Sequence, residues 1–379
     1  MARVKMARIK MHGPLGLKVS SALALNSIAV STYLRRIFGS RMEPTWDAYL
    51  EIGVRFWRHQ FTRALNGGDI AKGRMILDSL QTETTDVYDV DVRETTGAGG
   101  RWYHPRQGTT DATILYFHGG GYAFHGAMSH RFAAMLAHHI GAPVFAPDYR
   151  LTPEHPHPAQ SEDALAAWEY LTEEISPEKS VLIGDSAGAH MVLMLLHELK
   201  RIGRRQPAGA IALSPWTDIG DSVPHLHAND RYDLVQGWMA VKFGEWLNGG
   251  GRFVRDALSP VAHDYRDCAP IYLQAGGREI FHQTSIAFAE AQKNNGARLM
   301  LDIWPTMPHD FQLFDSSQTA STEALKRISE AVRFFVGEAA SFTPNGRTVV
   351  ENAFGKRPPC GVSAPVNNIS GLLTADEKS

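Results

Sequence analysis

The feature that most restricts the fold of this chain is an alternation of short apolar runs with helical segments between residues 110 and 337. The apolar runs are rich in Val, Ile, Leu and aromatic residues, as buried strands are. They are residues 112–117, 143–146, 180–183, 208–213, 271–275 and 298–304. The segments with helical length and spacing are 129–140, 159–174, 187–201, 283–295 and 321–336. This alternation predicts an α/β fold with a mostly parallel central sheet and helices on both faces.

The regions outside the alternation predict further parts of the molecule. Residues 86–95 and 101–104 suit antiparallel edge strands, because the first alternates at period two and the second is short and aromatic. Residues 46–80 and about 219–257 are helical in pattern and rich in Trp, Phe and Met, which indicates a helical cap over one end of the sheet. We therefore expect a basic N-terminal segment (1–42), a first cap part (43–82), a main domain (83–340) with a cap insertion (about 219–257), and a flexible tail (341–379).

Composition excludes several classes of protein. The 38 Lys and Arg residues nearly balance the 40 Asp and Glu residues, so no basic field favours nucleic acid as a partner. The two cysteines, Cys268 and Cys360, are too few for a disulfide framework or a cysteine-rich zinc site. We expect a cytoplasmic location.

The N-terminal segment leaves several interpretations open. Its charged residues are all basic: Arg3, Lys5, Arg8, Lys10, Lys18, Arg35, Arg36 and Arg41. The apolar stretch 19–34 is punctuated by serines and falls short of the roughly 20 apolar residues that cross a bilayer. It fits a targeting peptide, a helix lying on a membrane, or a helix packed on the body of the protein. Contact between residues 1–42 and a membrane surface is therefore one of the expectations.

A candidate nucleophile lies at Ser186. The motif Gly184-Asp185-Ser186-Ala187-Gly188 follows an apolar strand and precedes a helix, the setting of a serine on a sharp strand-to-helix turn. Glycines on both sides relieve crowding, so that the hydroxyl projects above the sheet. By itself such a motif is often a plain turn; its place between strand and helix favours a nucleophile.

A run of three glycines, Gly119-Gly120-Gly121, follows the first predicted strand of the main domain, after His118. Such a run suits a loop whose backbone approaches another group closely. With Ser186 nearby, we expect the N–H groups of Gly119, Gly120 and Ala187 to form an oxyanion hole. A phosphate-binding loop is the alternative, but neither the following Lys-Ser/Thr nor the G-x-G-x-x-G spacing is present.

A serine nucleophile requires a base and a carboxylate that orients the base. His309 is the best base, because it follows the last predicted strand and so lies at the strand end where Ser186 lies. Glu279, in the loop after the preceding strand, is the best orienting acid. Asp310 and Asp302 are rivals: Asp310 is adjacent to the base in sequence, and Asp302 is inside a strand.

With these residues the chain resembles the hormone-sensitive-lipase-like branch of the α/β hydrolases. The resemblance covers about residues 111–336 and rests on an ordered set of motifs: 118–122 (HGGGY), 148–154 (DYRLTPE), 184–188 (GDSAG), 214–218 (SPWTD) and the His309 loop. It implies a helical cap, no metal and no cofactor, and the roles given above for Ser186, Glu279 and His309. The family usually has Asp where this chain has Glu279, and commonly Gly where it has Asp310.

The resemblance implies a serine carboxylesterase that acts through an acyl-enzyme on a small-molecule ester. We expect an uncharged or hydrophobic ester of modest size, with Tyr122, Phe124, Trp216 and Trp238 as candidate pocket walls or, equally, ordinary core. A membrane-associated lipase, an amidase or lactonase, and a deacetylase of a secondary metabolite remain alternatives with the same triad. A non-catalytic receptor on this fold is disfavoured, because related receptors lose the histidine that this chain keeps at His309.

Overall fold

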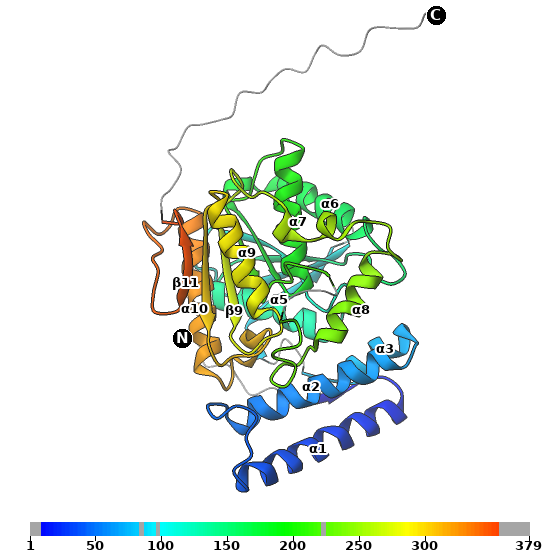
Figure 1. The fold of residues 1–379 in the computed structure, drawn as a ribbon. Coiled ribbons are helices and arrows are strands. Elements are labelled where there is room, and N and C mark those ends of the chain that lie inside the picture. The colour runs from blue at the N-terminus through cyan, green and yellow to red at the C-terminus, as the bar shows by residue number, and fades with distance from the viewer. Residues whose placement is uncertain (1–8, 83–86, 96–98, 221–224, 356–379) are drawn as a thin grey trace, which may run out of the picture.

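The computed structural model describes residues 9–82, 87–95, 99–220 and 225–355. Its centre is a nine-stranded sheet with the order β11-β10-β9-β8-β7-β5-β6-β4-β3 (Figure 1). The strands are β3 (Val90–Glu94), β4 (Gly100–Pro105), β5 (Thr113–Phe117), β6 (Val144–Pro147), β7 (Ser180–Asp185), β8 (Gly209–Leu213), β9 (Ile271–Gly276), β10 (Leu299–Trp304) and β11 (Thr348–Asn352). Strands β5 to β10 are parallel to their neighbours within this group, and β3, β4 and β11 pair antiparallel. The predicted α/β fold and the antiparallel edge strands are confirmed.

Helices cover both faces of the sheet because its strands are apolar on both sides. On one face lie α5 (Ala127–Ile140) and α10 (Thr319–Phe335), which pack on each other. On the other face lie α6 (Ala159–Glu174), α7 (Ala187–Arg201) and α9 (His282–Asn294). Consecutive strand residues alternate between the two cores: Val181 and Ile183 belong to the first, and Leu182 belongs to the second.

The cap is built from helices at two places in the sequence. The first place gives α1 (Leu15–Ile37), α2 (Ala48–Asn66) and α3 (Ile70–Leu77), and the insertion gives α8 (Gly237–Leu247). Asp47 and Asp69 begin α2 and α3 by accepting hydrogen bonds from the N–H groups of Leu50 (2.7 Å) and Lys72 (3.1 Å). The helical prediction for 46–80 is confirmed. In the insertion, the described part outside α8 consists mainly of turns.

Shorter elements complete the description. The strands β1 (Ile9–Met11) and β2 (Leu80–Thr82) pair antiparallel and tie the start of the described chain to the end of α3. Four 3-10 turns occur at η1 (Pro177–Lys179), η2 (Arg255–Leu258), η3 (Pro260–Ala262) and η4 (Phe311–Phe314).

The prediction of a flexible tail from residue 341 is wrong for residues 341–355. Strand β11 pairs with β10 at the edge of the sheet, and Phe342, Val350 and Phe354 are buried. The prediction relied on composition, and this region is rich in Pro, Gly, Ser and Asn. A few apolar side chains are nevertheless sufficient to anchor it. The rest of the predicted tail, 356–379, lies outside the described residues.

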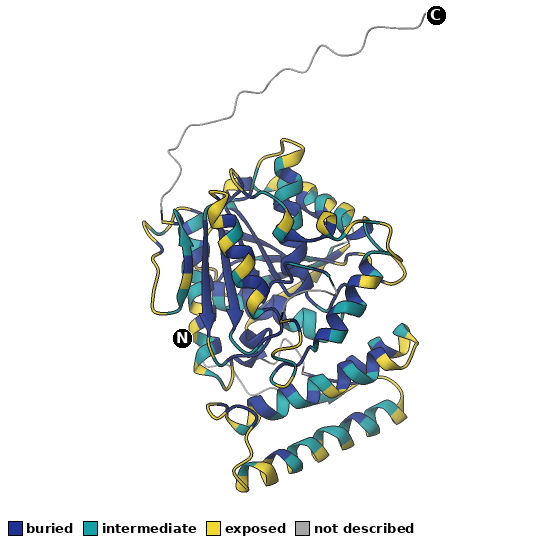
Figure 2. Ribbon diagram, in the orientation of Figure 1, coloured by how far each residue is buried: buried dark blue, intermediate teal, exposed yellow. Residues whose placement is uncertain are grey.

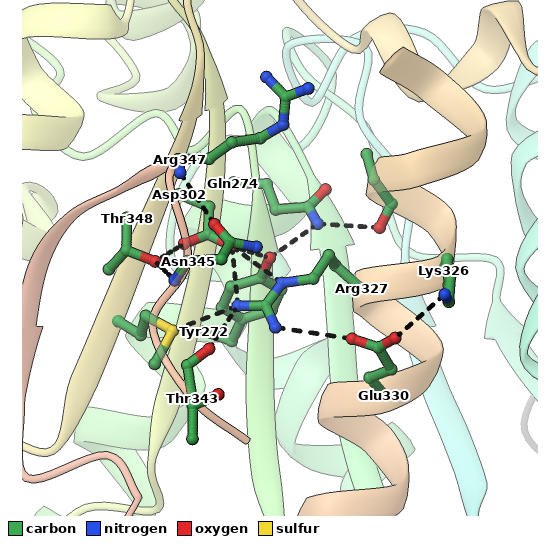
Figure 3. A network of polar contacts seen from close by, with 12 residues as sticks. Tyr272, Gln274, Asp302, Lys326, Arg327, Glu330, Thr343, Asn345, Arg347 and Thr348 are labelled. Atoms are coloured by element: carbon green, nitrogen blue, oxygen red, sulfur yellow. Dashed lines mark hydrogen bonds and ion pairs between the residues drawn. The ribbon is translucent and has the colours of Figure 1, made fainter. Parts of the chain in front are cut away.

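The edge beneath β11 is held by a polar network around Asp302 (Figure 3). Oδ2 of Asp302 accepts hydrogen bonds from the Tyr272 hydroxyl (2.7 Å) and from Nε of Arg327 (3.2 Å), and Oδ1 accepts one from Thr348 Oγ1 (2.5 Å). Gln274 donates in turn to the Tyr272 hydroxyl at 3.0 Å. Asp302 is therefore a structural residue that fixes β11 and α10, and it is not the acid of a catalytic triad.

Candidate active site

Ser186 lies on the turn between β7 and α7, at the carboxyl end of a central strand. Its φ of 53° and ψ of −116° place it in a strained conformation for a non-glycine residue. The turn requires glycine at position 188, because a Cβ there would collide with the carbonyl oxygen of Phe117. The expected strand–turn–helix setting of the serine is therefore present.

A cavity of about 250 Å³ opens above Ser186. Ser186, His309, Asp310 and the glycine run 119–121 line it, although these residues come from loops that follow three different strands. Aromatic side chains from the cap and the main domain form much of the remaining wall: Phe56, Trp57, Phe124, Trp216, Phe243 and Phe281. The cavity thus brings the candidate nucleophile and base together in largely apolar surroundings.

Two of the four predicted pocket walls line this cavity and two do not. Phe124 and Trp216 line it. Tyr122 instead points away into the core, where its hydroxyl lies 2.6 Å from Nδ1 of His190. Its φ of 61° reverses the local direction of the chain, which a sequence pattern does not reveal. Trp238 is outside the lining, half-buried on α8, with Nε1 donating to Gln236 Oε1 at 3.3 Å.

The prediction that Gly119 is an oxyanion donor is wrong. Its N–H donates to Oδ1 of Asp185 at 2.9 Å, so it is already occupied. Within the described residues, the N–H groups of Gly120, Gly121 and Ala187 have no acceptor. Gly121, the third glycine of the run, also lines the cavity and within the described residues has the unpaired N–H that Gly119 lacks. Asp185, which accepts a second hydrogen bond from the Tyr116 hydroxyl at 2.6 Å, fixes the start of the glycine loop.

His309 is buried, and its two ring nitrogens differ in their surroundings. Nε2 lies 3.3 Å from Oδ2 of Asp310, whereas Nδ1 has no hydrogen-bond partner among the described residues. The ring of Phe281 packs edge-on against the imidazole with a centroid distance of 5.4 Å. Burial lowers the pKa of His309 to about 3, so the resting side chain is neutral.

Glu279 lies behind the cavity wall and is fully buried. Its Oε2 accepts hydrogen bonds from the Ser214 hydroxyl (2.7 Å) and from Gly276 N–H (2.8 Å), while Oε1 has no partner among the described residues. Burial and the nearby charge of Asp233 raise the pKa of Glu279 well above its usual range. No hydrogen bond joins Glu279 to His309 in this structure. Oε1 of Glu279 and Nδ1 of His309 both lack a partner among the described residues, so each is available for such a bond.

Two side chains hold the loops of Glu279 and His309 together. Ser214 donates to Glu279 and accepts a hydrogen bond from the N–H of Asp310 at 3.1 Å. Asp233 accepts hydrogen bonds from the N–H of Ile280 (2.7 Å) and from the N–H of His309 (3.2 Å). Sequence reasoning missed both residues. Ser214 carried a signal, because it follows β8 at the same sheet edge as Ser186; Asp233 sits in a cap loop and carried none.

Replacing Asp233 by alanine should destabilise the protein and impair the site at once. The change leaves three buried N–H groups, of Leu234, Ile280 and His309, without their acceptor. We expect a loss of about 3 kcal/mol in the free energy of unfolding, measured by urea denaturation. Asp233→Asn, which keeps one acceptor oxygen, should lose less. Equal stability of Asp233→Ala and the parent protein would contradict this role.

Asp310 forms a carboxyl pair with Asp185 beside the base. Burial and the charge of Asp185 raise the pKa of Asp310 well above its usual range, and burial raises the pKa of Asp185 to about 6. The charge of one carboxyl group makes ionisation of the other less favourable, because like charges in a buried site repel. Among the described residues, no group of three or more His, Cys, Asp or Glu is arranged to hold a metal ion.

Comparison with known proteins identifies the class of this fold. The family model described as alpha/beta hydrolase fold matches residues 114–313. An acetyl-hydrolase of Streptomyces hygroscopicus is 31% identical over 62% of this chain and 80% of its own length. An esterase of Acinetobacter venetianus is 27% identical over 72% of this chain and 95% of its own length. The crystal structure of an esterase from the bacterial hormone-sensitive lipase family superposes with a TM-score of 0.64 at 26% identity, covering 83% of this chain and 98% of that one.

The chain is a hydrolase of the esterase and lipase type on the α/β-hydrolase fold. It belongs to the hormone-sensitive-lipase-like branch of that family, as its motifs indicated.

Proposed function

We propose that this esterase is a serine carboxylesterase that acts through an acyl-enzyme on an uncharged or hydrophobic ester of modest size. The observation that carries the proposal is the convergence of Ser186, His309 and free N–H groups on one largely apolar cavity. The cavity volume of about 250 Å³ favours a small acyl group, as does the name of the acetyl-hydrolase relative.

A cytoplasmic location accords with the free, buried thiol of Cys268.

In this mechanism His309 takes the proton of Ser186 as the serine oxygen attacks the ester carbonyl carbon. The N–H groups of Gly120, Gly121 and Ala187 stabilise the negative oxygen of the tetrahedral intermediate. His309 then gives its proton to the departing alcohol, and water, activated by the same imidazole, hydrolyses the acyl-enzyme. The helix α7 points its positive end at the reacting centre and adds to this stabilisation.

We assign the orienting role to Glu279. Its unpartnered Oε1 and the unpartnered Nδ1 of His309 are the acceptor and donor that such a role needs. Ser214 and Asp233 bridge the two loops, which keeps these atoms on neighbouring loops of the site. We propose that they pair when substrate binds. Nε2 of His309 is then left to face Ser186.

A fluorophosphonate probe and an ester panel test the proposal. The probe should label Ser186 covalently, as located by peptide mass spectrometry, because only an activated hydroxyl reacts. Hydrolysis of p-nitrophenyl esters from acetate to palmitate should be fastest for short acyl chains. Labelling at another serine, or none with an otherwise folded protein, would overturn the assignment.

At acidic pH, kcat/KM should fall with a midpoint below the ordinary pKa of histidine; this fall is called the acid limb. The base must be neutral to act, and burial lowers the pKa of His309 to about 3, so activity should persist as the pH falls from neutral to about 5. Two other sources of a limb compete with His309. They are the carboxyl pair, in which burial raises the pKa of Asp185 to about 6, and Glu279, whose pKa burial raises well above its usual range. A limb near pH 6.5 that persists both in Asp185→Asn and in the residual activity of Glu279→Gln would contradict the expectation.

A further inference from the structure

Helix α1 packs with its apolar stripe facing outward. Six large apolar residues are exposed on it: Leu15, Val19, Leu23, Val30, Leu34 and Ile37. At 3.6 residues per turn these positions fall within an arc of about 100°, and we call this arc the outward face. Leu15, Leu23 and Val30 are 75%, 65% and 60% exposed. The exposed residues Asn26 and Tyr33 fall in the same arc, so the face is apolar apart from one amide and one phenol. An exposed face of this composition marks a surface that binds another apolar phase.

The opposite side of α1 is fixed to the cap by both polar and apolar contacts. Ser21 and Thr32 are buried there, and Leu17 packs against the main core. The Ser21 hydroxyl lies 2.7 Å from that of Ser79 and accepts a hydrogen bond from Gln60 Nε2 at 3.0 Å. By length and composition α1 is able to cross a membrane, but crossing would break these bonds and expose polar groups to lipid. Because α1 lies at the outside of the molecule, against α2 (Figures 1 and 2), an orientation in the plane of a membrane surface keeps these bonds intact.

The charges near the outward face select the kind of surface. Every charged residue before Glu43 is basic. On α1, Lys18 lies beside the outward face, and Arg35 is exposed in the last turn, outside that face. Two copies of the chain packed through this face about a two-fold axis would bring like charges together. Anionic headgroups complement them. Phe38, 83% exposed at the end of the helix, adds an aromatic side chain of the kind found at membrane interfaces.

The cavity above Ser186 reaches the surface beside α1. Leu25 of α1 and Ile9 of β1 line this cavity together with Ser186 and His309. Ile9 is also 58% exposed, so the lining there continues into the molecular surface. A molecule dissolved in a membrane beneath α1 would therefore meet an apolar entrance rather than water.

We propose that the outward face of α1 binds an anionic membrane surface and that the enzyme hydrolyses esters dissolved in that membrane. The first part stands on α1 alone, and the second rests on the proposed esterase function. The face is a docking surface and takes no part in the chemistry.

Vesicle binding by the full chain tests the first part. The protein should float with phosphatidylcholine vesicles that contain about 30% phosphatidylglycerol, and much less with phosphatidylcholine alone or in about 0.5 M salt. The triple variant Val19→Ser, Leu23→Ser, Val30→Ser should bind about tenfold more weakly or worse. The double variant Val254→Ser, Val349→Ser is the matched control, because it removes exposed valines elsewhere and should bind like the parent.

Two substrates with short acyl groups separate the second part from the proposed function. The triple variant should keep the parent's rate on dissolved p-nitrophenyl butyrate and lose about tenfold on hexadecyl acetate carried in the vesicles, measured as released acetate. A parent protein that floats but hydrolyses neither ester would overturn the esterase function and leave the membrane contact standing. A parent that does not float, or one that is a dimer dissociated by the triple variant, would overturn the membrane contact.

Discussion

Ser186→Ala should lower kcat for p-nitrophenyl butyrate by about 10⁵- to 10⁶-fold. Alanine removes only the oxygen that attacks the carbonyl, and the strained turn keeps its backbone contacts, such as the hydrogen bond from N–H of residue 186 to Leu213 at 2.9 Å. The remaining acceleration over water comes from binding and from the N–H groups of Gly120, Gly121 and Ala187. Steady-state kinetics, with the enzyme concentration set by active-site titration of the parent, measure the loss.

The control for Ser186→Ala is Ser285→Ala on α9. Ser285 is also buried, and its hydroxyl has no hydrogen-bond partner among the described residues, so its loss should change neither kcat nor the free energy of unfolding. Circular dichroism and urea denaturation should show both variants as stable as the parent. A Ser186→Ala protein that keeps more than about a hundredth of the parent kcat would exclude Ser186 as the nucleophile.

The sequence predicted those parts of the fold in which local pattern and tertiary environment agree. The runs around Val181 and Leu273 are apolar on both faces, and only a sheet covered on both sides satisfies them. Phe342 and Val350 anchor a segment whose composition is typical of a loop. So few apolar residues do not form a strand pattern that can be detected in the sequence. Helix α1 shows a different limit: its apolar period is real, but period alone does not tell whether the stripe faces the protein or the solvent.

The same division applies to the active site. The meeting of Ser186 and His309 at one cavity was predictable, because the ends of parallel strands meet at one edge and bring their loops to one place. Gly119 was assigned the wrong role because the direction of one N–H depends on where the Asp185 carboxyl group lies. Asp233 joins the loops of Glu279 and His309, although it lies 76 residues before His309 in the sequence and belongs to no motif. Such roles depend on side-chain direction, which spacing along the chain does not encode.

Glu279→Gln should lower kcat by about 10³- to 10⁴-fold, whereas Asp310→Asn should lower it by no more than about tenfold. Ser214 and Gly276 donate to one oxygen of Glu279, so the glutamine carbonyl would take that place and its NH₂ group would face His309. An NH₂ donor at that place repels a proton on Nδ1 of His309. The imidazole would then carry its proton on the other ring nitrogen, Nε2, which could no longer accept the proton of Ser186. Glu279→Asp, which keeps the charge on a shorter arm, should recover part of the rate.

Asp310 is the rival candidate for the orienting acid, because its Oδ2 lies 3.3 Å from Nε2 of His309. In the proposed mechanism, however, Nε2 is the nitrogen that must face Ser186. A carboxyl group at that nitrogen does not orient the base towards the serine. Burial and the charge of Asp185 raise the pKa of Asp310, so we expect Asp310 to adjust the charge beside the base. Asp310→Asn should therefore shift the acid limb of kcat/KM more than it changes kcat. If Asp310→Asn instead loses about 10³-fold in kcat while Glu279→Gln loses less than tenfold, the orienting acid is Asp310, and Glu279 serves only to hold Ser214 and Gly276.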